Sequence, residues 1–392
     1  MKKFMLSLLS ISIVVIVVYY LAPPLNVEKY FGPVEPDKQS INVTTSPHGQ
    51  GTLFIADMHA DTLLWKRSIA EKSTLGHADL FRLLDANVGL QVFMSVIEAP
   101  NDVESDSIHP EGDQITSIAL LDKWPAKTLM SYKERALYQT SRLFKAAHDS
   151  AGKMTIILSQ EDLRNGIEAW QSHKGPLMAI LGLEGAHATE FKLENLDTLF
   201  NAGFRSMELA HYSDTDFAGS SSGMEKHGLT DKGIALIRKM NSVGMIIDVA
   251  HLSNRAIEDV LDLTASPVYS SHTGVYATCP KARNLPDKLI KRIAQSGGII
   301  GIGFFEGAIC EKSLDAIVRA IKHVSDLVGA EYVALGSGWD IAPLAITPKE
   351  LPDLTHALLA KGFSEDEVSE VMGKNVTRFF LKNLPADVKK RI

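Results

Sequence analysis

The sequence predicts a (β/α)8 barrel with insertions, preceded by an N-terminal transmembrane helix. From Thr52 onward, short apolar runs alternate with helical stretches, a pattern typical of parallel strands covered by helices. His, Asp or Glu residues, which commonly bind metals, follow several of these runs. Barrel enzymes carry their functional residues at the ends of their strands. The runs are 53–58, 90–96, 177–183, 204–210, 244–250, 267–271, 298–303 and 332–337. A doubly wound open sheet is the alternative.

The N-terminus predicts a membrane segment. Phe4 to Ala22 contains no charged residue and follows two lysines, and about 20 apolar residues suffice to cross a bilayer as a helix. The lysines place the N-terminus in the cytoplasm and the remainder outside that membrane, in the periplasm or the extracellular space. A cleaved signal peptide is the competing interpretation, because it shares the basic start and the apolar middle.

The rest of the chain divides simply. We expect a cytoplasmic end at 1–3, the signal-anchor at 4–22, a linker at 23–51, the barrel at 52–385 and a tail at 386–392. The longest insertion between strands is 97–135, and the apolar run 154–158 is expected to form an extra strand outside the barrel. Near the C-terminus, Ser364 and Glu367 predict a capping box that opens the closing helices.

Composition narrows the range of partners. The 392 residues carry a net charge of −7 without a stripe of Lys or Arg, so nucleic acid is an unsuitable partner. Cys279 and Cys310 lack Cys-x-x-Cys spacing, which argues against a cysteine zinc site, and we expect them to be buried free thiols. A small molecule or peptide suits this composition better.

His59 and Asp61 form the first predicted metal pair. Residues two apart on a strand point to the same face, so the imidazole and the carboxylate can bind one ion together. Similar residues end four later runs, although each histidine taken alone could be structural. These residues are Glu184, His211, His251 and His272.

Four histidines and two carboxylates exceed the ligands of one tetrahedral zinc ion. They suit two metals that share a carboxylate, and Glu184 would bridge them because each of its oxygens can bind one ion. Two adjacent metals activate water and polarise a carbonyl group. The predicted reaction is therefore hydrolysis of an amide or ester.

The order and spacing of these motifs resemble the membrane dipeptidase (renal dipeptidase) family over about residues 52–385. The resemblance rests on His59-x-Asp61, Glu184-Gly185, His211, Ile247-Asp248-Val249-Ala250-His251, Ser271-His272, Tyr276, Cys279, Arg283-Asn284-Leu285-Pro286-Asp287 and Gly373-Lys374-Asn375. It implies an amidohydrolase-type (β/α)8 barrel with two zinc ions that hydrolyses dipeptides. Expected partners are a dipeptide and a membrane, with a homodimer left open.

The resemblance also implies roles for single residues. His59, Asp61 and Glu184 would hold one zinc ion, and Glu184, His251 and His272 the other. His211 would stabilise the oxyanion that develops on the substrate carbonyl. Arg283 would bind the substrate's free carboxylate, although a surface ion pair is the alternative for this residue.

The chain departs from the family pattern at the last strand. Gly338 stands where the family has a catalytic Asp, in Gly336-Ser337-Gly338-Trp339-Asp340, so Asp340 becomes the predicted proton carrier, with a structural acid as the alternative. The segment 301–310 also lacks the Tyr that related enzymes often use to bind the substrate carboxylate. These departures leave two alternatives to a dipeptidase: a hydrolase of another small amide or ester, and a weakly active metal-binding or peptide-binding protein.

Overall fold

A closed parallel barrel forms the centre of the molecule. The computed structural model describes residues 23–32, 53–103, 106–109, 111–173 and 175–387. Eight strands run in the order β2-β1-β9-β8-β7-β6-β5-β4, and pairing of β2 with β4 closes the ring. The strands are β1 (Ile55–Ala60), β2 (Val88–Val96), β4 (Leu177–Glu184), β5 (Phe204–Glu208), β6 (Ile246–Asp248), β7 (Tyr269–Thr273), β8 (Ile299–Ile302) and β9 (Val333–Leu335).

This closure confirms the predicted barrel and excludes the open sheet. The eight strands are buried along their whole length, which explains why they read as continuous apolar runs rather than as alternating ones. The short strand β3 (Met154–Ile156) pairs with the first residues of β4 and lies outside the ring, as predicted for 154–158.

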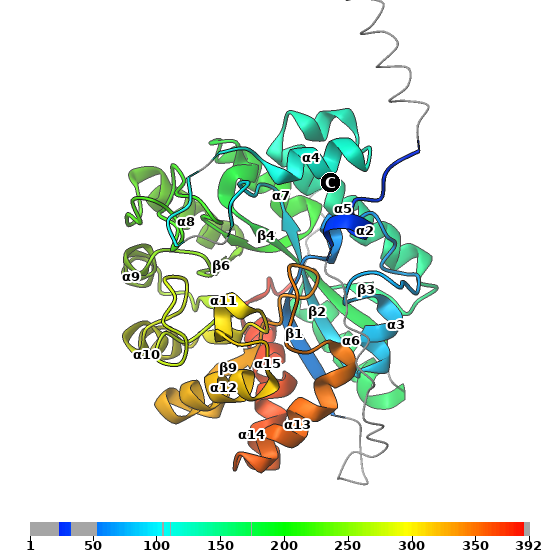
Figure 1. The fold of residues 1–392 in the computed structure, drawn as a ribbon, viewed down its shortest axis with the longest axis vertical. Coiled ribbons are helices and arrows are strands. Elements are labelled where there is room, and N and C mark those ends of the chain that lie inside the picture. Colours follow the sequence, from blue (N-terminus) through cyan, green and yellow to red (C-terminus); the bar gives the residue numbers. More distant parts are fainter. Residues whose placement is uncertain (1–22, 33–52, 104–105, 110, 174, 388–392) are drawn as a thin grey trace, which may run out of the picture.

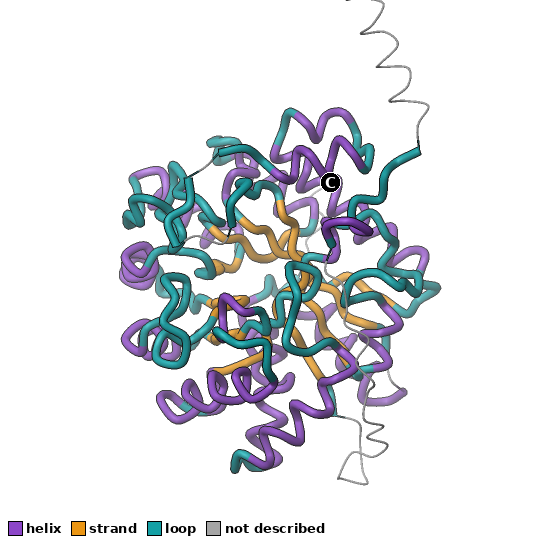
Figure 2. The backbone as a smooth tube through the Cα atoms, viewed as in Figure 1, coloured by secondary structure: helices purple, strands orange, loops and turns teal. Residues whose placement is uncertain are grey.

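Helices surround the strands in an outer layer (Figures 1 and 2). The longer helices bury one apolar stripe: in α12, Ile317, Ile321 and Val324 lie three or four residues apart on the buried face. The α-helices of this layer are α3 (Leu80–Asp85), α4 (Gln114–Leu121), α5 (Tyr132–Asp149), α6 (Gln160–His173), α7 (Glu194–Ala202), α8 (Asp231–Val243), α9 (Asn254–Leu263), α10 (Asp287–Gln295), α11 (Glu306–Ile309), α12 (Leu314–Val328), α13 (Leu351–Ala360), α14 (Glu365–Ser369) and α15 (Asn375–Asn383).

Short helical turns join several of these elements. They are the 3₁₀ turns η1 (Thr62–Leu64), η2 (Ala126–Leu129), η3 (Ala186–Thr189), η4 (Ala330–Tyr332) and η5 (Pro348–Glu350), and the π-helical turn η6 (Glu370–Lys374). The insertion 97–135 contributes α4 and η2. The predicted capping box is present, since the Ser364 hydroxyl accepts from the Glu367 backbone N–H and the Glu367 side chain accepts from the Ser364 N–H.

Residues 23–32 pack on the barrel rather than forming a free linker. They carry the short helix α2 (Glu28–Phe31). Just before it, the Val27 backbone N–H donates to the Asp122 carboxylate at 2.9 Å. Val27 is buried in a hydrophobic cluster with Leu64 and Trp65, and the buried Glu28 carboxylate pairs with the Arg67 guanidinium at 2.6 Å. The predicted span at 4–22 lies outside the described residues, and among the described residues no helix is long and apolar enough to cross a bilayer.

The prediction of two free thiols is wrong. Cys279 and Cys310 form a disulfide, with their Cα atoms 5.4 Å apart. Cys279 follows β7 and Cys310 ends α11 after β8, and β7 pairs with β8 in the barrel. A gap of 31 residues gave no sign of this contact, which depends on the two loops meeting at the same end of neighbouring strands.

Candidate metal centre

The predicted ligands converge at the carboxyl ends of the strands. His59 and Asp61 lie at the end of β1, Glu184 is the last residue of β4, and His272 lies within β7. His211 follows β5 and His251 follows β6. The barrel therefore gathers at one end six side chains that are up to 213 positions apart in the chain.

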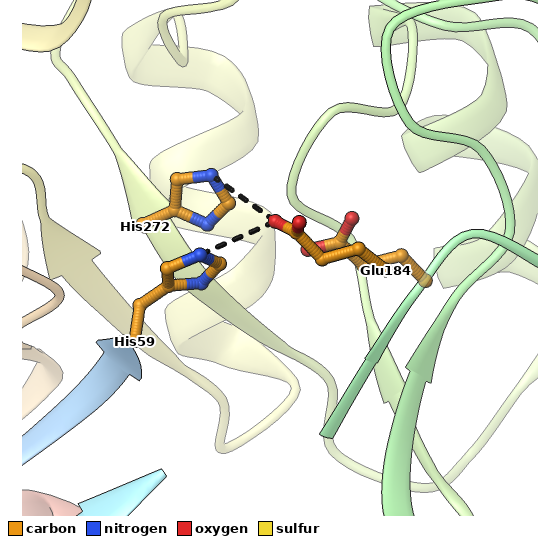
Figure 3. Close-up of side chains that lie close together, drawn as sticks. His59, Glu184 and His272 are labelled. Atoms are coloured by element: carbon orange, nitrogen blue, oxygen red, sulfur yellow. Dashed lines mark ion pairs between the residues drawn. The ribbon is translucent and has the colours of Figure 1, made fainter. Parts of the chain in front are cut away.

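Glu184 occupies the middle of this cluster. Its Oε1 lies 3.2 Å from Nε2 of His59 and 3.9 Å from Nε2 of both His251 and His272, and its Oε2 lies 3.4 Å from Nε2 of His211. Figure 3 shows His59 and His272 directed at the same Glu184 oxygen. The Asp61 Oδ1 atom adds a contact of 3.3 Å to His59 Nε2. A carboxylate with imidazoles at both oxygens has the geometry of a bridging ligand.

The spacing of these atoms fits metal coordination. Two ligands bound at about 2.0–2.1 Å to one tetrahedral zinc ion lie roughly 3.3 Å apart. Nε2 of His59 lies 3.2 Å from Oε1 of Glu184 and 3.3 Å from Oδ1 of Asp61. Nε2 of His251 lies 2.9 Å from Nε2 of His272. Buried polar atoms here also lack hydrogen-bond partners, among them His59 Nε2, Asp61 Oδ1 and Glu184 Oε1. The donor set therefore fits divalent metal ions.

Hydrogen bonds from behind fix the orientation of the imidazoles. The Ser271 hydroxyl lies 3.3 Å from Nδ1 of His59 and 3.0 Å from Nδ1 of His272, so the Nε2 atom of each ring is left for a ligand role. The backbone carbonyl of Glu98 accepts from Nδ1 of His211 at 2.9 Å. Asp57, behind the strand ends, accepts from the Ser337 backbone N–H at 2.8 Å and from its hydroxyl at 3.0 Å.

The direction of the pKa shift separates His251 and His272 from His59. Burial lowers the pKa of His251 and of His272 well below the ordinary value, so both rings are neutral and can donate a lone pair to a metal. For His59, burial also disfavours the charge, but Asp61 and Glu184 outweigh it and raise the pKa to about 10. A proton on His59 thus occupies the position between the carboxylates that a metal ion would take, and metal binding must displace it.

His251 shows backbone strain of the kind found at functional sites. Its φ is +63°, in the left-handed region that a residue with a Cβ rarely adopts. Because this turn directs the side chain toward Glu184 and His272, the strained conformation places a ligand that the end of β6 alone would not supply.

Arg283 lies beside the metal cluster. Its Nη2 is 3.4 Å from Nε2 of His251, and its guanidinium carbon lies 4.8 Å from the centre of the Phe305 ring. The buried Nη1 atom has no hydrogen-bond partner among the described residues. No acidic side chain pairs with Arg283 in the described part of the chain, so the surface ion pair considered above is not formed.

Asp340 lies close to the cluster, but its carboxylate is fully engaged. Thr62 donates to Oδ2 at 2.6 Å, Arg67 donates to the same oxygen, and the His77 backbone N–H donates to Oδ1. Burial opposes ionisation, yet the Arg67 guanidinium holds the pKa of Asp340 below its usual value. These contacts favour the structural alternative for Asp340 over the predicted role as proton carrier.

The sequence prediction missed Glu208, the last residue of β5. It is fully buried, and one of its oxygens lies within 4.8 Å of ligand atoms on His59, Glu184 and His272. Burial, Asp248 and Glu184 raise its pKa well above the ordinary value. The available signal was a single acid inside the apolar run 204–210, on the same face as Ser206, whose hydroxyl meets Tyr269 inside the barrel.

Comparisons with known proteins agree with the fold and the motifs. A profile described as membrane dipeptidase (peptidase family M19) matches residues 50–389. Dipeptidase tcpJ of Claviceps purpurea is 30% identical over 322 residues, which cover 78% of this chain and 69% of that protein. Uncharacterized dipeptidase C965.12 of Schizosaccharomyces pombe is 28% identical over 330 residues, covering 80% of this chain and 73% of that protein.

Solved structures show the same fold. A metallopeptidase from Rhodobacter sphaeroides, liganded with a phosphinate mimic of the dipeptide L-Ala-D-Ala, matches with a TM-score of 0.71 and 21% identity, covering 85% of this chain and all of that one. Dipeptidase AC, a metallopeptidase of family M19, matches with a TM-score of 0.69 and 22% identity over 86% of this chain and all of that one. The profile match spans most of the sequence, and this chain belongs to the membrane dipeptidase family, peptidase family M19.

Proposed function

We propose that this protein is a dipeptidase that depends on two zinc ions bridged by Glu184. The observation that carries the proposal is the convergence of four imidazoles on the two oxygens of one buried carboxylate. His59, Asp61 and Glu184 would hold one ion, and Glu184, His251 and His272 the other. Zinc suits sites rich in imidazole, and shared carboxylates are common in two-metal hydrolases.

The bound ions would polarise the scissile carbonyl and make water nucleophilic at neutral pH. His211 would stabilise the oxyanion on that carbonyl. Its Nδ1–H donates to the Glu98 carbonyl, and this bond holds the ring with Nε2 in the site, 3.4 Å from Oε2 of Glu184. Arg283 would bind the free carboxylate of the dipeptide through its unpartnered Nη1.

The proton for the leaving amine has no evident protein donor at position 338. Gly338 offers no carboxyl group, and the Asp340 carboxylate is bonded to Thr62, Arg67 and His77. This observation favours a second candidate function, a weakly active protein that binds metals and peptides. The two candidates predict different hydrolysis rates with the same metal content.

Metal removal separates these candidates. We expect the purified full-length protein to release free amino acids from a dipeptide panel, to lose that activity on chelation, and to regain it when zinc is added. Dipeptides capped at the C-terminus should be poorer substrates, because Arg283 then lacks a carboxylate to bind. A protein that holds two zinc ions and cleaves nothing would support the binding protein, and equal rates on capped substrates would favour a hydrolase of other small amides.

Gly338→Asp is expected to lower the free energy of unfolding by about 1–3 kcal/mol without raising the rate. Gly338 has a φ of +75°, and a Cβ there would lie 2.9 Å from Cδ1 of Phe305. The Phe305 ring thus fills the space that a side chain at 338 would need. Denaturant unfolding and dipeptide turnover measure the two effects.

Gly338→Ala is the matched control, since it adds the same Cβ without the carboxyl group. Adding Phe305→Ala to either variant should restore part of the lost stability. A large gain in rate from Gly338→Asp alone, at unchanged stability, would contradict this expectation and show that the natural site lacks only an acid.

We also propose that the barrel lies on the extracytoplasmic side of a membrane, held by residues 4–22. The charge-free segment after two lysines supports the anchor, and the Cys279–Cys310 disulfide supports an oxidising compartment. Without protease, the protein should be recovered in the membrane fraction. Protease added to spheroplasts, in which the outer envelope is open and the cytoplasmic membrane is intact, should digest the barrel. A barrel protected in spheroplasts but digested after lysis would contradict the proposal.

A further inference from the structure

Glu208 is a buried acid that the fold leaves without a partner. The residue is fully inaccessible to solvent, and neither carboxylate oxygen forms a hydrogen bond with any described residue. Asp57 and Asp248, two other buried acids of the barrel strands, accept hydrogen bonds from backbone N–H groups. Burying an unpartnered carboxylate is costly, so a group that compensates Glu208 is expected at this position.

The surroundings of Glu208 contain the groups that bind a cation. One Glu208 oxygen, one Glu184 oxygen and one nitrogen each of His59 and His272 all lie within 4.8 Å of one another. Glu208 reaches this position because it ends β5, which pairs with β4 through Met207 and with β6 through Asp248. The four atoms come from four different strands, β1, β4, β5 and β7, so this position exists only because the barrel brings the strands together.

The local charge also calls for a cation. Asp61, Glu184 and Asp248 all act on Glu208 as like charges, and Arg283 is the cation that opposes them. A divalent ion bound by Glu184 and Glu208 would offset the negative charge of both carboxylates directly.

We propose that Glu208 is a further ligand of the metal centre, placed beside the bridging Glu184 where its oxygen lies near the ligand nitrogens of His59 and His272. With Asp61 and Glu184 it gives this centre a third carboxylate. The added oxygen raises the coordination number available beyond the four ligands of a closed tetrahedral site and shifts the donor set toward harder ions such as Mn²⁺. The proposal deepens the proposed metal-dependent function and rests on its metal centre, but its test needs no hydrolysis.

The test is metal binding by the full-length protein in detergent, stripped of metal and titrated with zinc. For Glu208→Gln, which keeps the shape and removes the charge, we expect one ion to bind at least about 10-fold more weakly while the other is unchanged. The visible absorption spectrum of the cobalt-loaded protein should also change, because it reports the ligands directly. Asp122→Asn is the matched control: Asp122 is another buried acid with an unpartnered oxygen, outside both ligand groups, and removing its charge should leave metal affinity unchanged.

A second readout guards against simple misfolding. Removing an unpartnered buried carboxylate should leave the metal-free protein as stable as the wild type or more stable, while the rise in melting temperature on adding zinc becomes smaller. Glu208→Met should behave in the same way as Glu208→Gln. Wild-type zinc affinity together with an unchanged cobalt spectrum in both variants would overturn the proposal.

The outcomes for Glu208 and for the proposed function are separable. If the wild type binds two ions and cleaves no dipeptide, while Glu208→Gln loses affinity for one ion, the dipeptidase proposal fails and the ligand assignment stands. If the wild type cleaves dipeptides and Glu208→Gln keeps both affinities, the dipeptidase proposal stands and the ligand assignment fails.

Discussion

Glu184→Gln is expected to lower dipeptide hydrolysis by at least about 10³-fold and to reduce the bound zinc below two ions per chain. The reason is geometric: each Glu184 oxygen faces imidazole nitrogens, at 3.2 Å from His59 and 3.4 Å from His211, so a neutral amide would remove the shared ligand of both ions. Elemental analysis of metal content and turnover of a dipeptide measure the two effects on the same preparation.

The matched control is Glu168→Gln, at an exposed position within α6 and outside the ligand groups. It makes the same chemical change and should alter neither zinc content nor rate. If Glu184→Gln kept two zinc ions and a wild-type rate, the bridging role would be wrong, and the convergence of the four histidines would need another explanation.

The candidate metal ligands could be predicted from the sequence because the fold repeats one rule. Each parallel strand ends at the same edge, so a His or an acid after an apolar run is brought there whatever its position in the chain. That rule identified His59, Glu184 and His272, which the structure brings together. The rule missed Glu208 because that acid lies inside the predicted run 204–210 rather than after it. Only the direction of its side chain, into the barrel, distinguishes it from an acid that faces solvent.

Other features depend on contacts that no local pattern encodes. The Cys279–Cys310 disulfide joins two loops that meet only because β7 and β8 are neighbours. The partners of Asp340 come from the segment 62–77, more than 260 positions earlier in the chain. The prediction for Asp340 rested on its spacing two residues after Gly338, but spacing cannot show which side chains already bind a carboxylate.

Asp340→Asn is expected to lower the free energy of unfolding by about 3–5 kcal/mol. The change removes the charge that Arg67 faces inside the protein, where both side chains are nearly inaccessible and Arg67 keeps only Glu28 as an acidic partner. Because the folded-state pKa of Asp340 lies below the unfolded value of about 3.9, its contribution is complete above that pH and is lost as the pH falls through the folded pKa. Denaturant unfolding at neutral pH and again below pH ~4 should show the difference between wild type and variant narrowing.

Two comparisons decide whether Asp340 supports the fold or carries protons. Asp315→Asn, which breaks an exposed pair with Arg319, should cost less than ~1 kcal/mol and calibrates the measurement. Combining Asp340→Asn with Arg67→Met should cost less than the two single changes together, because the two charges stabilise each other. An Asp340→Asn protein of unchanged stability whose turnover falls by about 10²–10⁴-fold would instead identify Asp340 as the proton carrier.

Two contacts join the segments that follow β1 and β9. The Asp61 backbone N–H donates to the Trp339 carbonyl at 2.8 Å, and the Thr62 hydroxyl donates to the Asp340 carboxylate. Losing the Asp340 carboxylate should therefore loosen the segment that carries Asp61, a proposed metal ligand.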